Sequence, residues 1–150
     1  MQHGPDRLRA AGLRVTRTRL AVMDELAVHP HADVESIATG ARNRLGSVST
    51  QAVYDVLHAL TAVGIVRHIE PTGSPARFEL DNGDNHHHLV CRECGAIADV
   101  ACATGTSPCL TASDDGGYLV DEAEVTYWGL CTTCRTSHDS QPSTHPRRDS

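Results

Sequence analysis

The stretch His86-His87-His88-Leu89-Val90-Cys91-Arg92-Glu93-Cys94-Gly95 places three consecutive histidines directly before a Cys-x-x-Cys pair. A second pair, Cys131-x-x-Cys134, follows after 36 intervening residues. Zinc prefers four thiolates in a tetrahedron, and each pair supplies two of them from one tight turn. Gly95 suits this turn because glycine adopts backbone conformations that other residues avoid. The spacing predicts a structural zinc site, closed to catalysis, with four ligands: Cys91, Cys94, Cys131 and Cys134.

The three histidines lead into a β-prone segment, residues 87–91. On a strand, His86 and His88 point to one face and His87 to the other. Two imidazoles on one face, with carboxylates nearby, suit Fe(II), Mn(II) or Zn(II). This pattern indicates a second metal site; the alternative is a solvated run of histidines. Cys102 and Cys109 lack such spacing and are interpreted as small buried residues or incidental thiols.

Length and composition limit the class of protein. The chain has 150 residues, enough for one ordinary domain or two small ones. Aromatic residues make up only 3%, so a small core would benefit from a metal staple. The sequence shows no secretory signal and no apolar run approaching ~20 residues. We therefore expect a cytoplasmic protein without membrane contact, whose reduced thiols bind metal rather than form disulfides.

Charge is distributed unevenly along the chain. Residues 1–80 carry nine arginines and eight acidic residues, whereas residues 81–134 carry one arginine and nine acidic residues. The net charge of −6 thus does not exclude DNA binding by the first half.

Helical patterns dominate the first half. We expect a short helix over residues 5–11, and longer helices that begin at the caps Thr16, Asp33 and Ser49 and end near residues 28, 45 and 63. Two short β-prone runs, residues 65–70 and 76–80, flank a loop with turn residues. Helices followed by a hairpin are typical of a winged helix-turn-helix domain; a generic small α+β domain is the alternative.

The second half is predicted to be mainly β. Strands are expected over residues 87–91, 96–102 and 118–128, with a short helix over residues 108–112. The expected organisation is an α+β fold with a winged-helix domain over residues 1–80, a hinge over 81–85, a small α/β domain over 86–134 and a disordered tail over 135–150.

The sequence closely resembles the ferric uptake regulator (Fur) family of bacterial metal-dependent repressors. More narrowly, it resembles the actinobacterial FurA/CatR type, which is PerR-like and controls catalase or catalase-peroxidase genes. The matching segments, in the family's order, are residues 12–19, 29–33, 51–54, 77–79, 86–95 and 131–134. The resemblance implies a DNA-binding winged helix followed by a domain that forms a homodimer, bound to double-stranded DNA with a pseudo-palindromic operator.

The resemblance also implies a regulatory metal site. In the family its ligands are a histidine before the third helix, an acid on the second wing strand, two strand histidines and an acid after the zinc knuckle. These positions are His29, Glu79, His86, His88 and Asp99. Because the ligands come from both halves, metal binding is expected to fix the angle between the domains, so that two recognition helices fit successive major grooves.

The signal that such a site senses depends on its ligands. In the family, aspartate at the position of Asp99 accompanies peroxide sensing, in which hydrogen peroxide reacts with Fe(II) and a ligand histidine, here His29 or His86, is oxidised. Glu79 is instead the residue typical of iron sensors. The family has a further metal site on the other face of this strand. In this sequence, the only matching ligands for that site are His87 and either Glu122 or Glu124.

The helix that begins at Ser49 is the expected recognition helix, and Asp55 stands on it where the family usually has arginine. Its N-terminal side chains can meet phosphates and base edges, and arginines before the second helix and on the wing can contact the DNA backbone. The predicted DNA-binding residues are Arg14, Arg17, Arg19, Ser49, Thr50, Gln51, Tyr54, Arg67 and Arg77.

Three functions follow from these residues. The first is a non-enzymatic, Fe(II)-dependent repressor that hydrogen peroxide inactivates; Mn(II) or Zn(II) can replace iron in its site. The second is an iron- or zinc-level sensor without a peroxide response. The third is a metal-dependent enzyme, which is disfavoured because the protein ligands nearly saturate the site and no general base stands beside an open position.

Overall fold

The computed structural model describes residues 4–84, 86–105, 108–121 and 123–139. The chain divides into two compact units, residues 1–84 and residues 85–150. The boundary between them lies within the segment expected to be a hinge.

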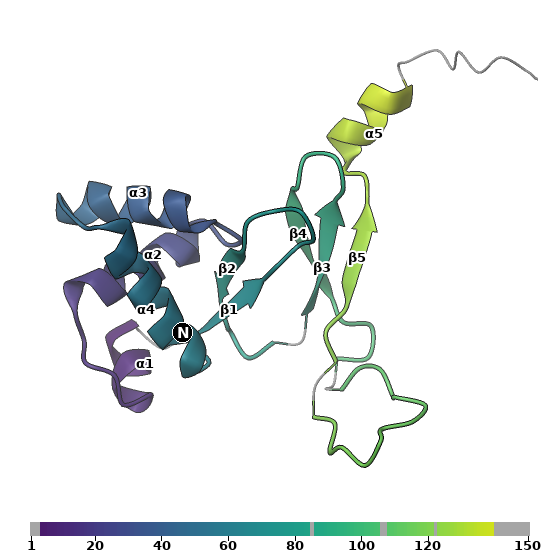
Figure 1. The fold of residues 1–150 in the computed structure, drawn as a ribbon, viewed down its shortest axis with the longest axis horizontal. Helices are drawn as coiled ribbons and strands as arrows, with labels where there is room; N and C mark the ends of the chain where they lie inside the picture. The colour runs from purple at the N-terminus through teal and green to yellow at the C-terminus, as the bar shows by residue number, and fades with distance from the viewer. Residues whose placement is uncertain (1–3, 85, 106–107, 122, 140–150) are drawn as a thin grey trace, which may run out of the picture. The chain divides into compact units, whose positions relative to one another are not determined.

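The first unit contains four helices and a hairpin (Figure 1). The helices are α1 (Gly4–Ala10), α2 (Arg17–Val28), α3 (Val34–Leu45) and α4 (Thr50–Ala62). Each of the three predicted caps is confirmed, because a side-chain oxygen accepts a hydrogen bond from a backbone N–H of the first turn. The donor–acceptor distances are 3.2 Å for Thr16, 2.8 Å for Asp33 and 3.1 Å for Ser49.

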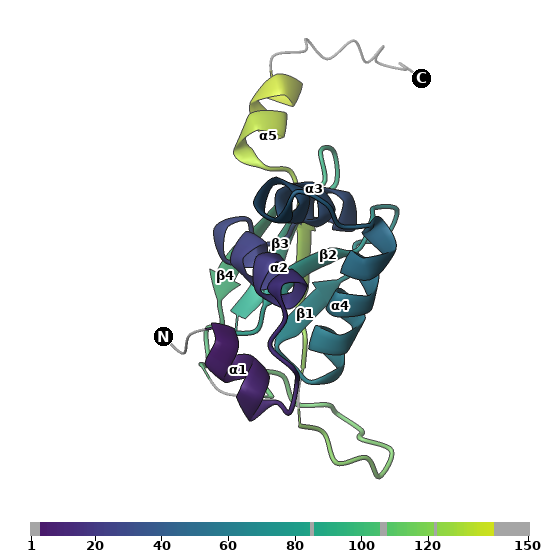
Figure 2. The same cartoon turned by 90° about the vertical axis from the view of Figure 1, so that its left-hand side faces the viewer.

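Helices α2, α3 and α4 pack around an aliphatic core (Figure 2). Side chains that are at most 1% exposed come from every helix of this unit: Leu8, Val22, Leu26, Ile37, Leu57 and Leu60. Burial of each such side chain contributes roughly 1.5–3 kcal/mol. This core supports the hairpin, whose Val66 is also buried against it.

The hairpin pairs β1 (Val66–Ile69) with β2 (Arg77–Leu80) in antiparallel register, with Val66 opposite Leu80. The layout of helices followed by a two-stranded wing confirms the prediction from the sequence. Strand β2 also reaches the turn before α3, because the Phe78 N–H donates to the Ala32 carbonyl at 3.0 Å.

The second unit is a three-stranded sheet with one helix. Its strands are β3 (His86–Cys91), β4 (Ile97–Ala101) and β5 (Thr126–Gly129), in the order β4-β3-β5 (Figure 1). Strand β3 runs antiparallel to β4 and parallel to β5. Helix α5 (Thr132–Asp139) follows β5.

Three predictions for this unit were wrong in part. Residues 108–112 are not helical, because five residues form little more than one helical turn, which is too short to be stable by itself. Of the strand expected over residues 118–128, only β5 forms, since only its residues pair with β3. Residues 135–139, expected in the tail, belong to α5; residues 140–150 lie outside the described part.

Every helix among residues 4–84, 86–105, 108–121 and 123–139 is too short or too polar to cross a lipid bilayer.

Candidate metal centres and nucleic-acid interface

The four cysteines of the two Cys-x-x-Cys pairs lie together at one end of the second unit's sheet. Their sulfur atoms all lie within 4.8 Å of one another, and the Sγ atoms of Cys94 and Cys131 are 3.7 Å apart. A tetrahedral zinc with Zn–S bonds of ~2.3 Å places its ligand sulfurs roughly 3.8 Å apart. The four cysteines therefore fit a zinc ion, as the spacing predicts.

The pairing of the strands explains why distant cysteines meet. Because β3 and β5 are parallel, with Cys91 opposite Gly129, both strands deliver the chain to the same end of the sheet. The knuckle after Cys91 turns back into β4, and its Gly95 has a φ of 70°. Cys131 then begins the turn into α5. The parallel pairing of β3 with β5, together with the left-handed backbone of Gly95, thus brings the four cysteines together.

Backbone amides support these thiolates. The N–H of Cys131 donates to the Cys91 sulfur at 3.3 Å. Backbone N–H donors, that of Cys94 foremost, lower the pKa of Cys91 to about 6. The neighbouring Cys131 thiol instead raises the pKa of Cys134 to about 12. The proximity of the sulfur atoms thus opposes ionisation of all four thiols together. A bound divalent cation would offset the repulsion between the four thiolates.

The histidine face of β3 is a second potential metal centre. The Nε2 atoms of His86 and His88 are each 3.7 Å from Oδ1 of Asp99, and the ring centroids lie 5.0 Å apart. Asp99 is positioned by register, since it lies opposite His88 in the β3–β4 ladder. One carboxylate and two imidazoles on one face form a donor set suited to Fe(II), Mn(II) or Zn(II). Alternation along β3 thus places His86 and His88 on one face, and the register with β4 adds Asp99.

In the first unit, Glu79 is almost fully buried and contacts His31. The His31 Nε2 atom is 2.9 Å from Oε2 of Glu79. The bridge between Ala32 and Phe78 holds the turn against β2, and His31 has a φ of 62°, which directs the chain toward Glu79. The sequence offered one signal for this contact, a second histidine two positions after His29.

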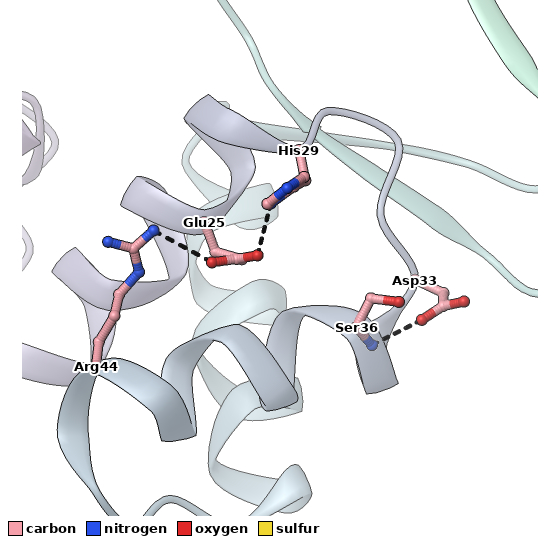
Figure 3. Close-up of polar contacts among 5 residues, drawn as sticks. All are labelled: Glu25, His29, Asp33, Ser36 and Arg44. Atoms are coloured by element: carbon pink, nitrogen blue, oxygen red, sulfur yellow. Dashed lines mark hydrogen bonds and ion pairs between the residues drawn. The ribbon is translucent and has the colours of Figure 1, made fainter.

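His29, which the resemblance assigns to the regulatory metal, has a different partner here. Its Nδ1 atom is 2.8 Å from Oε1 of Glu25, and its side chain is 64% exposed (Figure 3). Within the first unit, the structure therefore brings Glu79 together with His31 and not with His29.

Glu25 was not anticipated from the sequence. This carboxylate on α2 is buried, and it also accepts a hydrogen bond from Arg44 at 3.2 Å (Figure 3). It lies against Gly40 of α3, where a Cβ atom would come within 2.1 Å of the Glu25 Cδ atom. A glycine inside a helix thus creates the space for a carboxylate that holds His29.

A third group of ligands was also missed. His87, Cys102 and Cys109 lie together on the opposite face of β3 from His86 and His88, with Cys109 Sγ 3.2 Å from His87 Nε2. The Thr104 hydroxyl lowers the pKa of Cys102 to about 6, whereas burial raises the pKa of Cys109. Glu122, considered with His87 from the sequence, lies outside the described residues.

The predicted DNA-binding residues fall into two groups. Arg14 and Arg17 are exposed near the start of α2, and Tyr54 is 51% exposed on α4. A hollow between these elements is lined by Arg14, Arg19 and Asp55, among others. The Gln51 amide donates to Asp55 at 2.9 Å. These side chains are accessible to a nucleic acid.

The other predicted residues have partners within the first unit. The Ser49 side chain caps α4, and the Thr50 hydroxyl accepts a hydrogen bond from Arg42 at 2.7 Å. The wing arginines form ion pairs: Arg67 is 3.4 Å from Asp81 and Arg77 is 3.8 Å from Asp33. DNA would compete with these contacts, so the exposed Arg14 and Arg17 near the start of α2 are the stronger candidates.

Comparisons with known proteins identify the family of this chain. The chain matches the ferric uptake regulator family over residues 10–122. It is 61% identical over 141 residues to the transcriptional regulator FurA of Mycobacterium tuberculosis, covering 94% of this chain and 95% of that protein. It is 29% identical over 134 residues to the peroxide-responsive repressor PerR of Staphylococcus epidermidis, covering 85% of each. The crystal structure of the Vibrio cholerae ferric uptake regulator superposes with a TM-score of 0.64 at 25% identity, covering 85% of this chain and 98% of that one.

The winged-helix unit, the four-cysteine cluster and the histidine-carboxylate face thus occur in a chain whose family match spans most of its length. The chain belongs to the ferric uptake regulator family of DNA-binding transcriptional regulators and is not an enzyme.

Proposed function

We propose that this protein is an Fe(II)-dependent repressor that hydrogen peroxide inactivates, and that it controls catalase, catalase-peroxidase and other oxidative-stress genes. The observation that carries the proposal is the position of Asp99, whose carboxylate faces both His86 and His88 at 3.7 Å. Similarity to a FurA and to a peroxide-responsive repressor supports it.

The proposed regulatory ligands are His29, Glu79, His86, His88 and Asp99. Imidazole and carboxylate donors suit Fe(II), and Mn(II) or Zn(II) can occupy the same set. His31 joins them as a further candidate, since it contacts Glu79 at 2.9 Å. A bound Fe(II) would supply an electron to hydrogen peroxide, and the role of the protein would be to hold His29 and His86 where they can be oxidised.

In this proposal, metal binding changes the population of DNA-binding conformations. The ligands come from both compact units, so a metal that binds them all favours one angle between the units. To shift the ratio of two conformations from 1:99 to 99:1, the metal must bind one of them more tightly by ~5.5 kcal/mol. Five protein ligands can supply a difference of this size, and oxidation of one histidine removes part of it.

The remaining parts of the proposal follow from the same resemblance. Zn(II) occupies the four-cysteine cluster and stabilises the second unit. A homodimer in the cytoplasm places two α4 helices on a pseudo-palindromic operator in double-stranded DNA. Direct contacts are proposed for the nine residues named from the sequence, and among them Arg14, Arg17 and Tyr54 have the most accessible side chains.

DNase footprinting on a catalase-gene promoter tests this function. We expect protection with the Fe(II)-loaded protein, loss of protection after peroxide, and the mass of one added oxygen atom on a peptide that contains His29 or His86. The Mn(II)-loaded protein is the matched control and should stay bound after peroxide. Unchanged occupancy of the Fe(II) form after peroxide would exclude the sensing role but not the repressor.

The second candidate is an iron- or zinc-level sensor without a peroxide response. Glu79 favours it, because iron sensors of the family carry glutamate at this position. This candidate predicts that operator binding follows the free metal concentration and that no histidine gains oxygen. Comparing Glu79→Asp with the unaltered protein in the footprinting experiment separates the two: a peroxide response gained only by the variant would support the level sensor.

A further inference from the structure

The third ligand group, His87, Cys102 and Cys109, has the composition of a metal site that shares no residue with the other two. One ligand atom from each residue lies within 4.8 Å of the others. All three residues belong to the second unit, so its own fold brings them together. They are contributed by β3, by the residue that follows β4, and by the long connection to β5.

The burial of His87 is the second observation. Its side chain is only 4% exposed. Its Nε2 atom contacts the Cys109 sulfur at 3.2 Å, while its Nδ1 atom is buried and has no hydrogen-bond partner among the described residues. The contact at Nε2 is with a thiol, which is a weak hydrogen-bond partner. A cation bound to Nε2 and to the two sulfur atoms would replace this weak contact by coordinate bonds.

The position of His87 separates this group from the other centres. It points to the face of β3 opposite His86 and His88, because side chains alternate along a strand. It also lies at the beginning of β3, whereas the four-cysteine cluster lies at the strand's end. An ion at His87 therefore does not compete for the ligands of either site.

We propose that His87, Cys102 and Cys109 bind a thiophilic closed-shell cation, Zn(II) or Cu(I). Two thiolates and one imidazole are soft to borderline donors, which these two ions prefer over Fe(II), Mn(II) or Mg(II). Three protein ligands leave the fourth position of a tetrahedron open to water or a thiol; for Cu(I), three ligands are sufficient. Binding would tie the connection after β4 to the sheet.

The test uses the full chain with zinc retained in the four-cysteine cluster and with His86→Ala and His88→Ala to remove the histidine face. Titration with Co(II), which reports thiolate ligands through charge-transfer absorption, should fill one further site per chain. Adding Cys102→Ser and Cys109→Ser should abolish that absorption and one equivalent of bound metal. A parallel titration with Cu(I) against a competing chelator distinguishes the two ions by relative affinity.

Thiol protection provides a second measurement. Zn(II) or Cu(I) should protect Cys102 and Cys109 from alkylation at least tenfold, and His87→Gln should reduce this protection, whereas His58→Gln on the exposed face of α4 should not. Equal metal content with and without the two serine substitutions, or equal alkylation of Cys102 and Cys109 with and without metal, would overturn the proposal. A Cys102–Cys109 disulfide in the purified protein, without metal uptake after reduction, would overturn it in favour of a redox pair.

Discussion

At the scale of single residues, neighbours decide which of several similar side chains takes part in a site. His29 and His31 both flank Pro30, yet the side chain of His29 is 64% exposed beside Glu25, whereas that of His31 is only 10% exposed beside Glu79. The backbone makes the difference, since His31 adopts a left-handed φ of 62° and Ala32 pairs with Phe78. Sequence spacing alone treats the two histidines as equivalent.

Gly40→Ala tests how Glu25 is held. Alanine favours a helix by up to ~1 kcal/mol over glycine, but its Cβ atom would displace the Glu25 carboxylate and its hydrogen bonds to His29 and Arg44. We expect a net loss of ~1 kcal/mol in the free energy of unfolding, measured in urea. In a Glu25→Ala background the same substitution should be neutral or stabilising; destabilisation there as well would refute the steric explanation.

Cys102 provides a pH-dependent measurement. The Thr104 hydroxyl lowers its pKa from 9.0 to about 6, so the thiolate forms as pH rises through about 6. In protein that carries only its structural zinc, the alkylation rate of Cys102 should therefore rise with a midpoint near pH 6. Thr104→Val removes the hydroxyl and should move the midpoint upward; an unchanged midpoint would show that the hydroxyl is not the cause.

At the scale of elements, one strand serves three groups of ligands. Strand β3 turns His86 and His88 to one face and His87 to the other, and ends at Cys91 of the four-cysteine cluster. Its pairing with β4 supplies Asp99, and its pairing with β5 brings in the second cysteine pair. In the first unit, α4 exposes Tyr54 and contributes Asp55 to the hollow that Arg14 and Arg19 also line.

Salt dependence tests the assignment of the DNA-binding arginines. Each phosphate contact releases counterions and contributes a slope of about −0.9 to the dependence of log K on log salt. Arg14→Ala and Arg17→Ala should each weaken binding to all sequences and reduce the slope by about 0.9. Arg9→Ala is the control, because Arg9 pairs with Asp6 at 2.9 Å on α1. An equal effect of Arg9→Ala would mean that only net charge matters.

At the scale of the whole molecule, the two compact units depend on metal in different ways. The first unit has a buried aliphatic core that involves every one of its helices. The sheet of the second unit contributes few buried apolar side chains, Val90 among them, and has the four-cysteine cluster at its end. We infer that zinc supplies a large part of the second unit's stability, as is common for small domains.

Two substitutions distinguish the structural from the regulatory centre. Cys131→Ser should release zinc, lower the melting temperature of the second unit and abolish dimers, as measured by calorimetry and sedimentation. His86→Ala should leave melting and assembly unchanged but remove metal-dependent DNA binding. If both variants lost structure to the same extent, the division into two separate centres would be wrong.

The sequence by itself determined the parts of this protein that depend on local chemistry. Capping side chains set the starts of α2, α3 and α4, and the four-cysteine cluster follows from the Cys-x-x-Cys spacing. The alternation of side chains along a strand likewise separated His86 and His88 from His87. These features require only neighbours in the chain, and so short patterns predict them.

Only the tertiary structure decided the contacts between residues distant in the chain. Helix packing places Glu25 against Gly40. Packing and strand register together decide that His31, and not His29, contacts Glu79, and that Cys102 and Cys109 lie beside His87. The limited extent of β5 and the helical form of residues 135–139 also follow from pairing with β3 and from the turn at Cys131. The physical reason is that packing between elements, and not local preference, selects among backbone conformations of similar energy.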